Sequence, residues 1–118
     1  MNRNEAVDAA EDLLVALESL RRCTRQAETA VRRGMRANEQ GSTVDEVFTV
    51  VDPAVVRESM NVALKAVEQG RHRLRLAVFA EALRAGVSIG ELGRVFGFSR
   101  QLAARYARES QNGLVRSA

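Results

Sequence analysis

The stretch GVSIGELGRVFGFSRQLAARYARE, residues 86–109, holds the signals that decide the fold. Ser88, followed three residues later by a glutamate, forms a capping-box pattern and predicts a short helix that Gly97 closes. Ser99 is a second capping residue and predicts another helix that runs to about Ser110. Two helices joined by a short turn that contains glycine are typical of a helix-turn-helix arrangement.

The apolar residues of this stretch are spaced so that the two helices share a core. The positions that we expect to face it are Leu92, Phe96, Phe98, Ala103 and Tyr106. Gly97 permits the positive φ angle that the turn needs, and Gly93 is small enough to let the two helices cross closely. We therefore expect a β-branched side chain to be strained at Gly97 but tolerated at Gly41, in a linker upstream.

The same residues resemble the helix-turn-helix of bacterial DNA-binding regulators, in the form found in actinobacterial proteins and in sigma-factor region 4. That form reads E-L/I-G-x-x-h-G-h-S-R-Q-x-A, with h for an apolar residue. It is matched by Glu91, Leu92, Gly93, Phe96, Gly97, Phe98, Ser99, Arg100, Gln101 and Ala103. The likeness covers about residues 74–109. The family often has alanine at the position of Gly93 and valine or isoleucine at that of Ala103, so looser packing is expected here.

The resemblance implies that the helix after Ser99 enters the major groove of double-stranded DNA. Arginine pairs bidentately with guanine and glutamine with adenine, which suits Arg100 and Gln101 at the tip of that helix. The expected DNA-binding set is Ser99, Arg100, Gln101, Ala104, Arg105 and Arg108, with Arg71, Arg73 and Arg75 as phosphate contacts. The alternative is an ordinary helical corner in a small bundle.

The charge of the chain is distributed unevenly. Residues 1–70 have a net charge of −3 and residues 71–118 a net charge of +6, so the overall value of +3 conceals an asymmetry. A basic segment of this kind favours a polyanionic partner for the C-terminal part. A solvated basic surface is the alternative.

Residues 4–35 predict one long amphipathic helix. Its apolar positions repeat in alternating steps of three and four, and a lone helix cannot bury such a seam. The predicted seam runs through Ala10, Leu13, Leu17, Leu20, Thr24, Ala27 and Val31. We expect it to pack against a second long helix and to dimerise the chain, with an interface formed by Leu13, Leu17, Leu20 and Val31.

The segment after this helix reads as a linker over residues 37–43, by its composition. Thr43, with Glu46 three residues later, forms another capping-box pattern and predicts a short helix. The β-branched and aromatic residues that follow also suit a strand. A helix is favoured because an isolated strand has no partner here.

A long central helix is predicted to begin at the pair Asp52-Pro53. A capping carboxylate followed by proline at the first helical position is a clear start signal. The helix is expected to extend to about residue 85, with Gly86 closing it and Gly70 as a candidate break.

The composition bounds the function. The chain has 118 residues, enough for one domain, and its 46% apolar content can supply a core. No stretch reaches the roughly 20 apolar residues of a membrane span, and the polar first dozen residues hold no signal-peptide core. A single cysteine, Cys23, and a single histidine, His72, provide neither a disulfide nor a metal-ligand set nor a nucleophile–base pair. We therefore expect no enzymatic activity, no cofactor and no metal. We expect a cytoplasmic location.

The sequence predicts an all-α protein in which a long N-terminal helix packs with a long central helix, followed by a C-terminal helix-turn-helix. Residues 1–70 form a helical dimerisation region, residues 71–110 the DNA-binding region and residues 111–118 a flexible tail. The function expected is sequence-specific DNA binding by a homodimeric transcriptional regulator, associated with the nucleoid. Two alternatives stand beside it: an adaptor that binds a protein partner (antitoxin-like or RNA-polymerase-associated), and a non-specific nucleoid protein.

Overall fold

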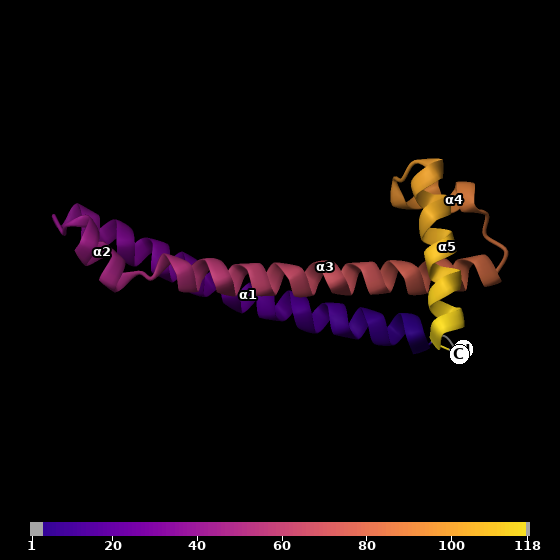
Figure 1. The fold of residues 1–118 in the computed structure, drawn as a ribbon, viewed down its shortest axis with the longest axis horizontal. Helices are drawn as coiled ribbons and strands as arrows, with labels where there is room; N and C mark the ends of the chain where they lie inside the picture. Colours follow the sequence, from indigo (N-terminus) through magenta and orange to yellow (C-terminus); the bar gives the residue numbers. More distant parts are fainter. Residues whose placement is uncertain (1–3, 118) are drawn as a thin grey trace. The chain divides into compact units, whose positions relative to one another are not determined.

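The computed structural model describes residues 4–117, and the side chains of residues 5–112. Every regular element in this range is a helix, which confirms the predicted all-α class. In chain order (Figure 1) they are α1 (Asn4–Glu39), α2 (Val44–Val50), α3 (Pro53–Arg84), α4 (Ile89–Phe96) and α5 (Arg100–Ser117). None of these helices, over the described residues, combines the length and the apolar character that crossing a membrane requires.

The chain divides into two compact units whose limits fall inside the two long helices. Unit 1 contains residues 1–12 and 70–118, and unit 2 contains residues 13–69. One unit limit, between residues 69 and 70, lies beside the boundary after residue 70 that is expected from the sequence. In addition, the first turns of α1 group with the C-terminal part of the chain.

Unit 2 is a hairpin in which α1 and α3 run antiparallel and α2 lies in the connection between them (Figure 1). Cys23 Sγ of α1 lies 3.4 Å from Met60 Sδ of α3. A Cβ atom on Gly34 would lie 3.4 Å from Val51 Cγ2 and 3.7 Å from Val47 Cγ1. The inner seam of α1 consists of the buried and half-buried residues Leu13, Ala16, Leu20, Cys23, Ala27, Ala30, Gly34 and Ala37. Most of these side chains are small, which lets neighbouring segments approach closely.

The inner seam differs from the predicted seam at every second position. Leu13 and Leu20 lie on it, as predicted, and both are half-buried. Leu17 and Val31 lie one residue further round α1, where they are 40% and 56% exposed. The predicted seam combined residues of two adjacent faces of α1, because apolar residues occupy both faces. Residues one position apart on a helix point about 100° away from each other, so the two faces are distinct in the structure.

Among the described residues, three helices end at a glycine with a left-handed backbone. The φ angles are +85° at Gly41, +91° at Gly86 and +74° at Gly97. The amide after each glycine donates to a carbonyl five residues earlier, as in the 2.8 Å bond from Phe98 N–H to Gly93 O, so each helix ends in a Schellman motif. The ends predicted at Gly86 and Gly97 are confirmed. The tolerance expected at Gly41 is wrong, because a β-branched side chain is strained in this conformation.

Two helices are longer than predicted, and one is unbroken. α1 continues to Glu39, into the segment read as a linker, because its stop signal is Gly41. α5 continues to Ser117, beyond the predicted end near Ser110. In the described range no glycine with a left-handed backbone follows Ser110, so the helix has no such stop signal there. α3 runs without interruption through Gly70, which is buried.

The predicted start signals of α2 and α3 are both formed. Thr43 Oγ1 accepts the Glu46 N–H at 3.2 Å, and the Thr43 N–H donates to Glu46 Oε1 at 2.9 Å, which completes the capping box. The bond from the Thr43 N–H to the carboxylate, with a smaller contribution from the Thr43 hydroxyl, holds the pKa of Glu46 below its ordinary value. Asp52 Oδ1 accepts the N–H groups of Ala54 and Val55, at 3.1 and 3.3 Å.

Candidate nucleic-acid interface

The core of unit 1 is centred on Phe79 of α3, which is fully buried. It forms one cluster with Leu92 of α4 and with Ala103 and Ala107 of α5. The rings of Phe96, Phe98 and Tyr106 surround it, with centroids 5.1, 6.5 and 6.1 Å from that of Phe79. The burial predicted for Leu92 and Ala103 is confirmed. Phe79 was not singled out by the sequence because its role depends on how α3 meets the two later helices.

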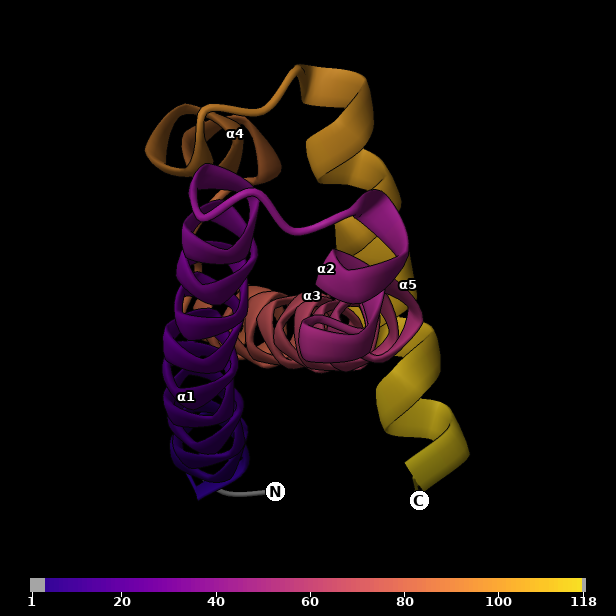
Figure 2. The ribbon, with the colours of Figure 1, turned by 90° about the vertical axis from the view of Figure 1, so that its left-hand side faces the viewer.

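Residues 97–99 connect α4 to α5, and Figure 2 shows the chain passing from one helix into the other. Ser99 Oγ accepts the Leu102 N–H at 3.1 Å and so caps α5. Ser88 Oγ accepts the Glu91 N–H at 3.1 Å and caps α4. Within the described residues, the Glu91 carboxylate accepts no bond from the Ser88 backbone N–H. Only one half of the predicted capping box is therefore formed.

α4 and α5 come close together at Gly93. A Cβ atom on this glycine would lie 3.2 Å from the Phe98 carbonyl oxygen and 3.5 Å from Ala103 Cβ. The first distance is shorter than most Cβ contacts, and the neighbour is backbone, which moves with difficulty. The close approach of the two helices that was predicted at Gly93 is therefore confirmed.

The exposed face of α5 carries the predicted recognition residues. Gln101, Ala104, Arg105 and Arg108 follow the three- and four-residue spacing of one helix face, and Arg100 lies beside them. All are exposed except Ala104, which is half-buried; Ser99 is exposed at the start of the helix. In the described part of the chain no carboxylate pairs with any of these three arginines.

Arg75 of α3 is held against α5 by aromatic rings. Its guanidinium carbon lies 4.7 Å from the ring centroid of Tyr106 and 5.6 Å from that of Phe98. Its Nη1 atom lies 3.3 Å from His72 Nδ1. Since Phe98 belongs to the connection between α4 and α5 and Tyr106 belongs to α5, Arg75 contacts both of these segments by cation–π contacts.

His72 makes a second link between α3 and α5. Its Nε2 atom lies 2.9 Å from Glu109 Oε2, and its ring meets Tyr106 edge-on with centroids 5.9 Å apart. Arginine can only donate, so Nδ1 accepts from Arg75, while Nε2–H donates to the carboxylate. The neutral ring satisfies both contacts in this tautomer.

The other predicted phosphate contacts also have partners within the chain. Arg73 forms an ion pair with Asp12 of α1, and both side chains are more than half exposed. Arg71 is exposed and is not free of contacts either. Arg94, which is not among the residues predicted from the sequence, is exposed on α4 and has no acidic partner among the described residues. Its place two residues after buried Leu92, on the opposite face, is the signal that identifies it.

Comparison of the chain with protein-family models, with curated proteins and with solved structures gave no match. Within the described residues, no three side chains of His, Cys, Asp or Glu are grouped so that they could hold a metal ion. The α4–α5 surface instead offers guanidinium and amide groups, which donate to the acceptor atoms of base edges and phosphates.

Proposed function

We propose that this chain is a sequence-specific double-stranded DNA-binding protein that acts as a homodimeric transcriptional regulator. In this proposal α4 and α5 form a helix-turn-helix, and the first turns of α5 enter the major groove. The observation that carries it is the pair Arg100 and Gln101, exposed at the start of a helix that a capped turn holds. Arg100 is also without a carboxylate partner among the described residues.

The roles follow from the chemistry of each side chain. Arg100 pairs with the two acceptors of guanine and Gln101 with adenine, while the methyl group of Ala104 suits the methyl group of thymine. Arg105, Arg108 and Arg94 supply charge for phosphates, which adds affinity without sequence information. Arg75 takes the role of a positioning residue, because its guanidinium is already engaged by rings.

Regulation then consists of occupying a DNA site at the bacterial nucleoid, with no cofactor required. A two-fold symmetric dimer presents two such helices, so the site is expected to be a palindrome. A non-specific nucleoid protein uses the same arginines without reading bases. An adaptor uses the helical surfaces of unit 2 for a protein partner.

The experiment that tests the proposal is selection of bound sequences from random double-stranded DNA by the purified full chain. Enrichment of one palindrome supports it. Binding that weakens with salt but enriches no sequence identifies a non-specific protein and overturns the base-reading role. No binding at low salt overturns the DNA-binding function altogether and favours the adaptor.

A further inference from the structure

Unit 2 has a second stripe on α1, beside the inner seam. We call it the outer stripe, and it consists of Leu14, Leu17, Arg21, Thr24, Glu28, Val31 and Met35. These residues follow alternating steps of three and four, so they share one helix face. Its large apolar side chains are 64%, 40%, 56% and 58% exposed at Leu14, Leu17, Val31 and Met35.

The hairpin has little interior of its own. Its best-buried described residues, Cys23, Ala63, Val67 and Ala37, keep 8–9% of their surface exposed, whereas Phe79 and Ala103 of unit 1 are at 0%. Apolar residues stand exposed on all three helices of the unit, including Phe48 of α2 at 54%. Exposed apolar surface on this scale marks an interaction site.

We propose that a second copy of this chain covers the outer stripe, with the two α1 helices antiparallel and a two-fold axis near Thr24. The order of side chains along the stripe carries the argument. Antiparallel pairing brings Leu14 opposite Met35 and Leu17 opposite Val31. It also brings Arg21 opposite Glu28, so opposite charges meet on both sides of the axis.

The parallel arrangement lacks this complementarity. It brings Arg21 against Arg21 and Glu28 against Glu28, and like charges in contact across a helix pair are unfavourable. Unit 2 as a whole holds as many Asp and Glu residues as Arg and Lys residues, so two copies do not repel each other through net charge. Self-association in the antiparallel sense is therefore favoured by the chain's own charges.

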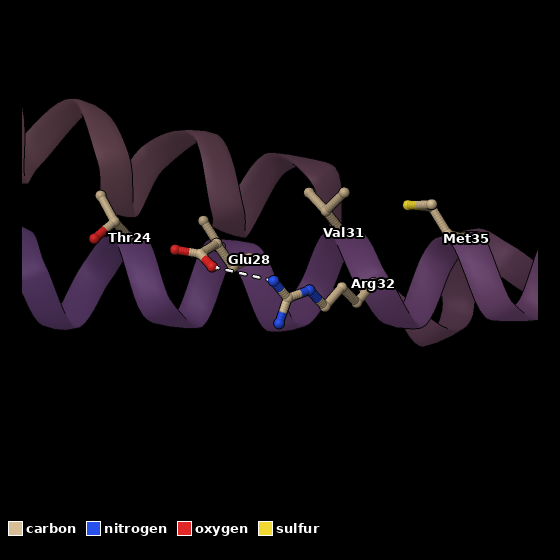
Figure 3. A pocket seen from close by; sticks show the side chains of 6 residues that line it. Thr24, Glu28, Val31, Arg32 and Met35 are labelled. Atoms are coloured by element: carbon tan, nitrogen blue, oxygen red, sulfur yellow. Dashed lines mark ion pairs between the residues drawn. The ribbon is translucent and has the colours of Figure 1, made fainter.

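A groove on α1 provides space for the second copy. It has a volume of about 420 Å³ and is lined by Thr24, Ala27, Glu28, Val31, Arg32 and Met35 (Figure 3). In the antiparallel pairing, Leu14 and Leu17 of the second copy lie over its apolar end, at Val31 and Met35. Glu28 now pairs with Arg32 at 3.5 Å, but both side chains are more than 60% exposed. Such a pair contributes little, so Glu28 can exchange partners.

Cysteine cross-linking tests the direction of the pairing. In a Cys23→Ala background, checked for unchanged helix content by circular dichroism, Thr24→Cys should give a disulfide-linked dimer on mild oxidation. Leu17→Cys alone should not, but a mixture of the Leu17→Cys and Val31→Cys proteins should cross-link to each other. Gln26→Cys, exposed elsewhere on α1, is the control and should stay largely unlinked. Self-linking of Leu17→Cys would show parallel pairing and overturn the proposal.

Charge reversal tests the pairing with the native cysteine retained. Arg21→Glu and Glu28→Arg should each raise the dimer dissociation constant several-fold, and the double variant should restore it, as measured by sedimentation equilibrium.

Leu17→Glu should raise the dimer dissociation constant at least about tenfold, because it puts a charge into an apolar interface. A full chain that stays at its 13.0 kDa monomer mass at every concentration overturns the proposal, as does a dimer that Leu17→Glu leaves intact. The inference rests on the proposed function only for the homodimer. No DNA is present in these experiments, so a failure to bind DNA and a failure to dimerise are distinguished.

Discussion

Arg75 connects α3 to the two parts of the candidate interface through the rings of Phe98 and Tyr106. A cation over an aromatic ring contributes about 0.5–2 kcal/mol, depending on how far it is desolvated, and Arg75 is half-buried. We expect Arg75→Gln to lower the free energy of unfolding by about 1 kcal/mol, measured by urea denaturation. Arg108→Gln, an exposed control on α5, should change it by no more than about 0.5 kcal/mol. Equal effects would show that the ring contacts do not stabilise the fold.

Arg100 and Arg108 should separate base reading from phosphate binding. Arg100→Ala is expected to cost about 1–3 kcal/mol of specific binding and to relax the preference at one position of the site. Arg108→Ala should weaken binding to all sequences alike and reduce the slope of log affinity against log salt by about 1. Fluorescence anisotropy with selected and random duplexes measures both. Identical behaviour of the two variants would remove Arg100 from the base-reading set.

Glu46 provides a pH-dependent contact at the start of α2. The Thr43 backbone N–H, and to a smaller extent the Thr43 hydroxyl, keep the pKa of its carboxyl below the ordinary value. A pKa lowered by folding stabilises the helix above the ordinary glutamate pKa, and this contribution disappears as the pH falls through the lowered value. Thr43→Ala removes the hydroxyl but keeps the backbone N–H, so titration by NMR should show the pKa of Glu46 rising only part of the way toward normal. An unchanged pKa in that variant contradicts the contribution of the hydroxyl.

At the scale of the element, Gly90 and Gly93 lie on the same helix with different surroundings. Nothing lies within 4 Å of a Cβ atom added at Gly90, whereas one at Gly93 meets the Phe98 carbonyl oxygen. Gly90→Ala should stabilise the chain by up to about 1 kcal/mol, the helix propensity difference between the two residues. Gly93→Ala should destabilise it, because the connection must move. Thermal unfolding measures both; stabilisation by both variants would show that α4 and α5 are further apart than described.

The ends of α3 and α4 could be predicted from the sequence because their signals are local. Gly86, Gly97 and Ser99 each act on the residues immediately beside them, so their pattern is sufficient. The contact of His72 with Glu109 joins residues 37 positions apart, and no local pattern encodes it. The two stripes of α1 also could not be separated, because apolar residues occupy both and only the position of α3 decides which is inner.

For the predicted DNA-binding residues too, the sequence identifies the features that depend on local signals but not those that depend on tertiary packing. The exposure of Arg100, Gln101 and Arg108 follows from helix periodicity once Ser99 is recognised as a cap. The partners of Arg73 and Arg75 do not, because Asp12 and Tyr106 reach them only through tertiary packing. A count of arginines in residues 71–75 therefore overstates the charge that remains available to a polyanion.

For the whole molecule, the thin interior of unit 2 implies that folding and assembly are linked. A chain that folds as a dimer gains about 1.4 kcal/mol of stability per mole of dimer for each tenfold rise in concentration. We expect the melting temperature, followed by circular dichroism, to rise with protein concentration, and to stop doing so in Leu17→Glu. A melting temperature that is the same at all concentrations would show that the single chain is stable by itself.

The small side chains of the inner seam have an entropic consequence. Alanine and glycine lose no rotamer freedom when they are buried, whereas leucine and methionine lose a substantial amount. The hairpin closes on Ala16, Ala27, Ala30, Gly34 and Ala37, so forming it immobilises few side chains. The large side chains of Leu14, Leu17 and Met35 are exposed in the single chain and keep their rotamer freedom there. They become ordered only when the dimer forms. Forming the dimer from folded chains should therefore carry an unfavourable side-chain rotamer entropy that the small residues of the inner seam largely avoid.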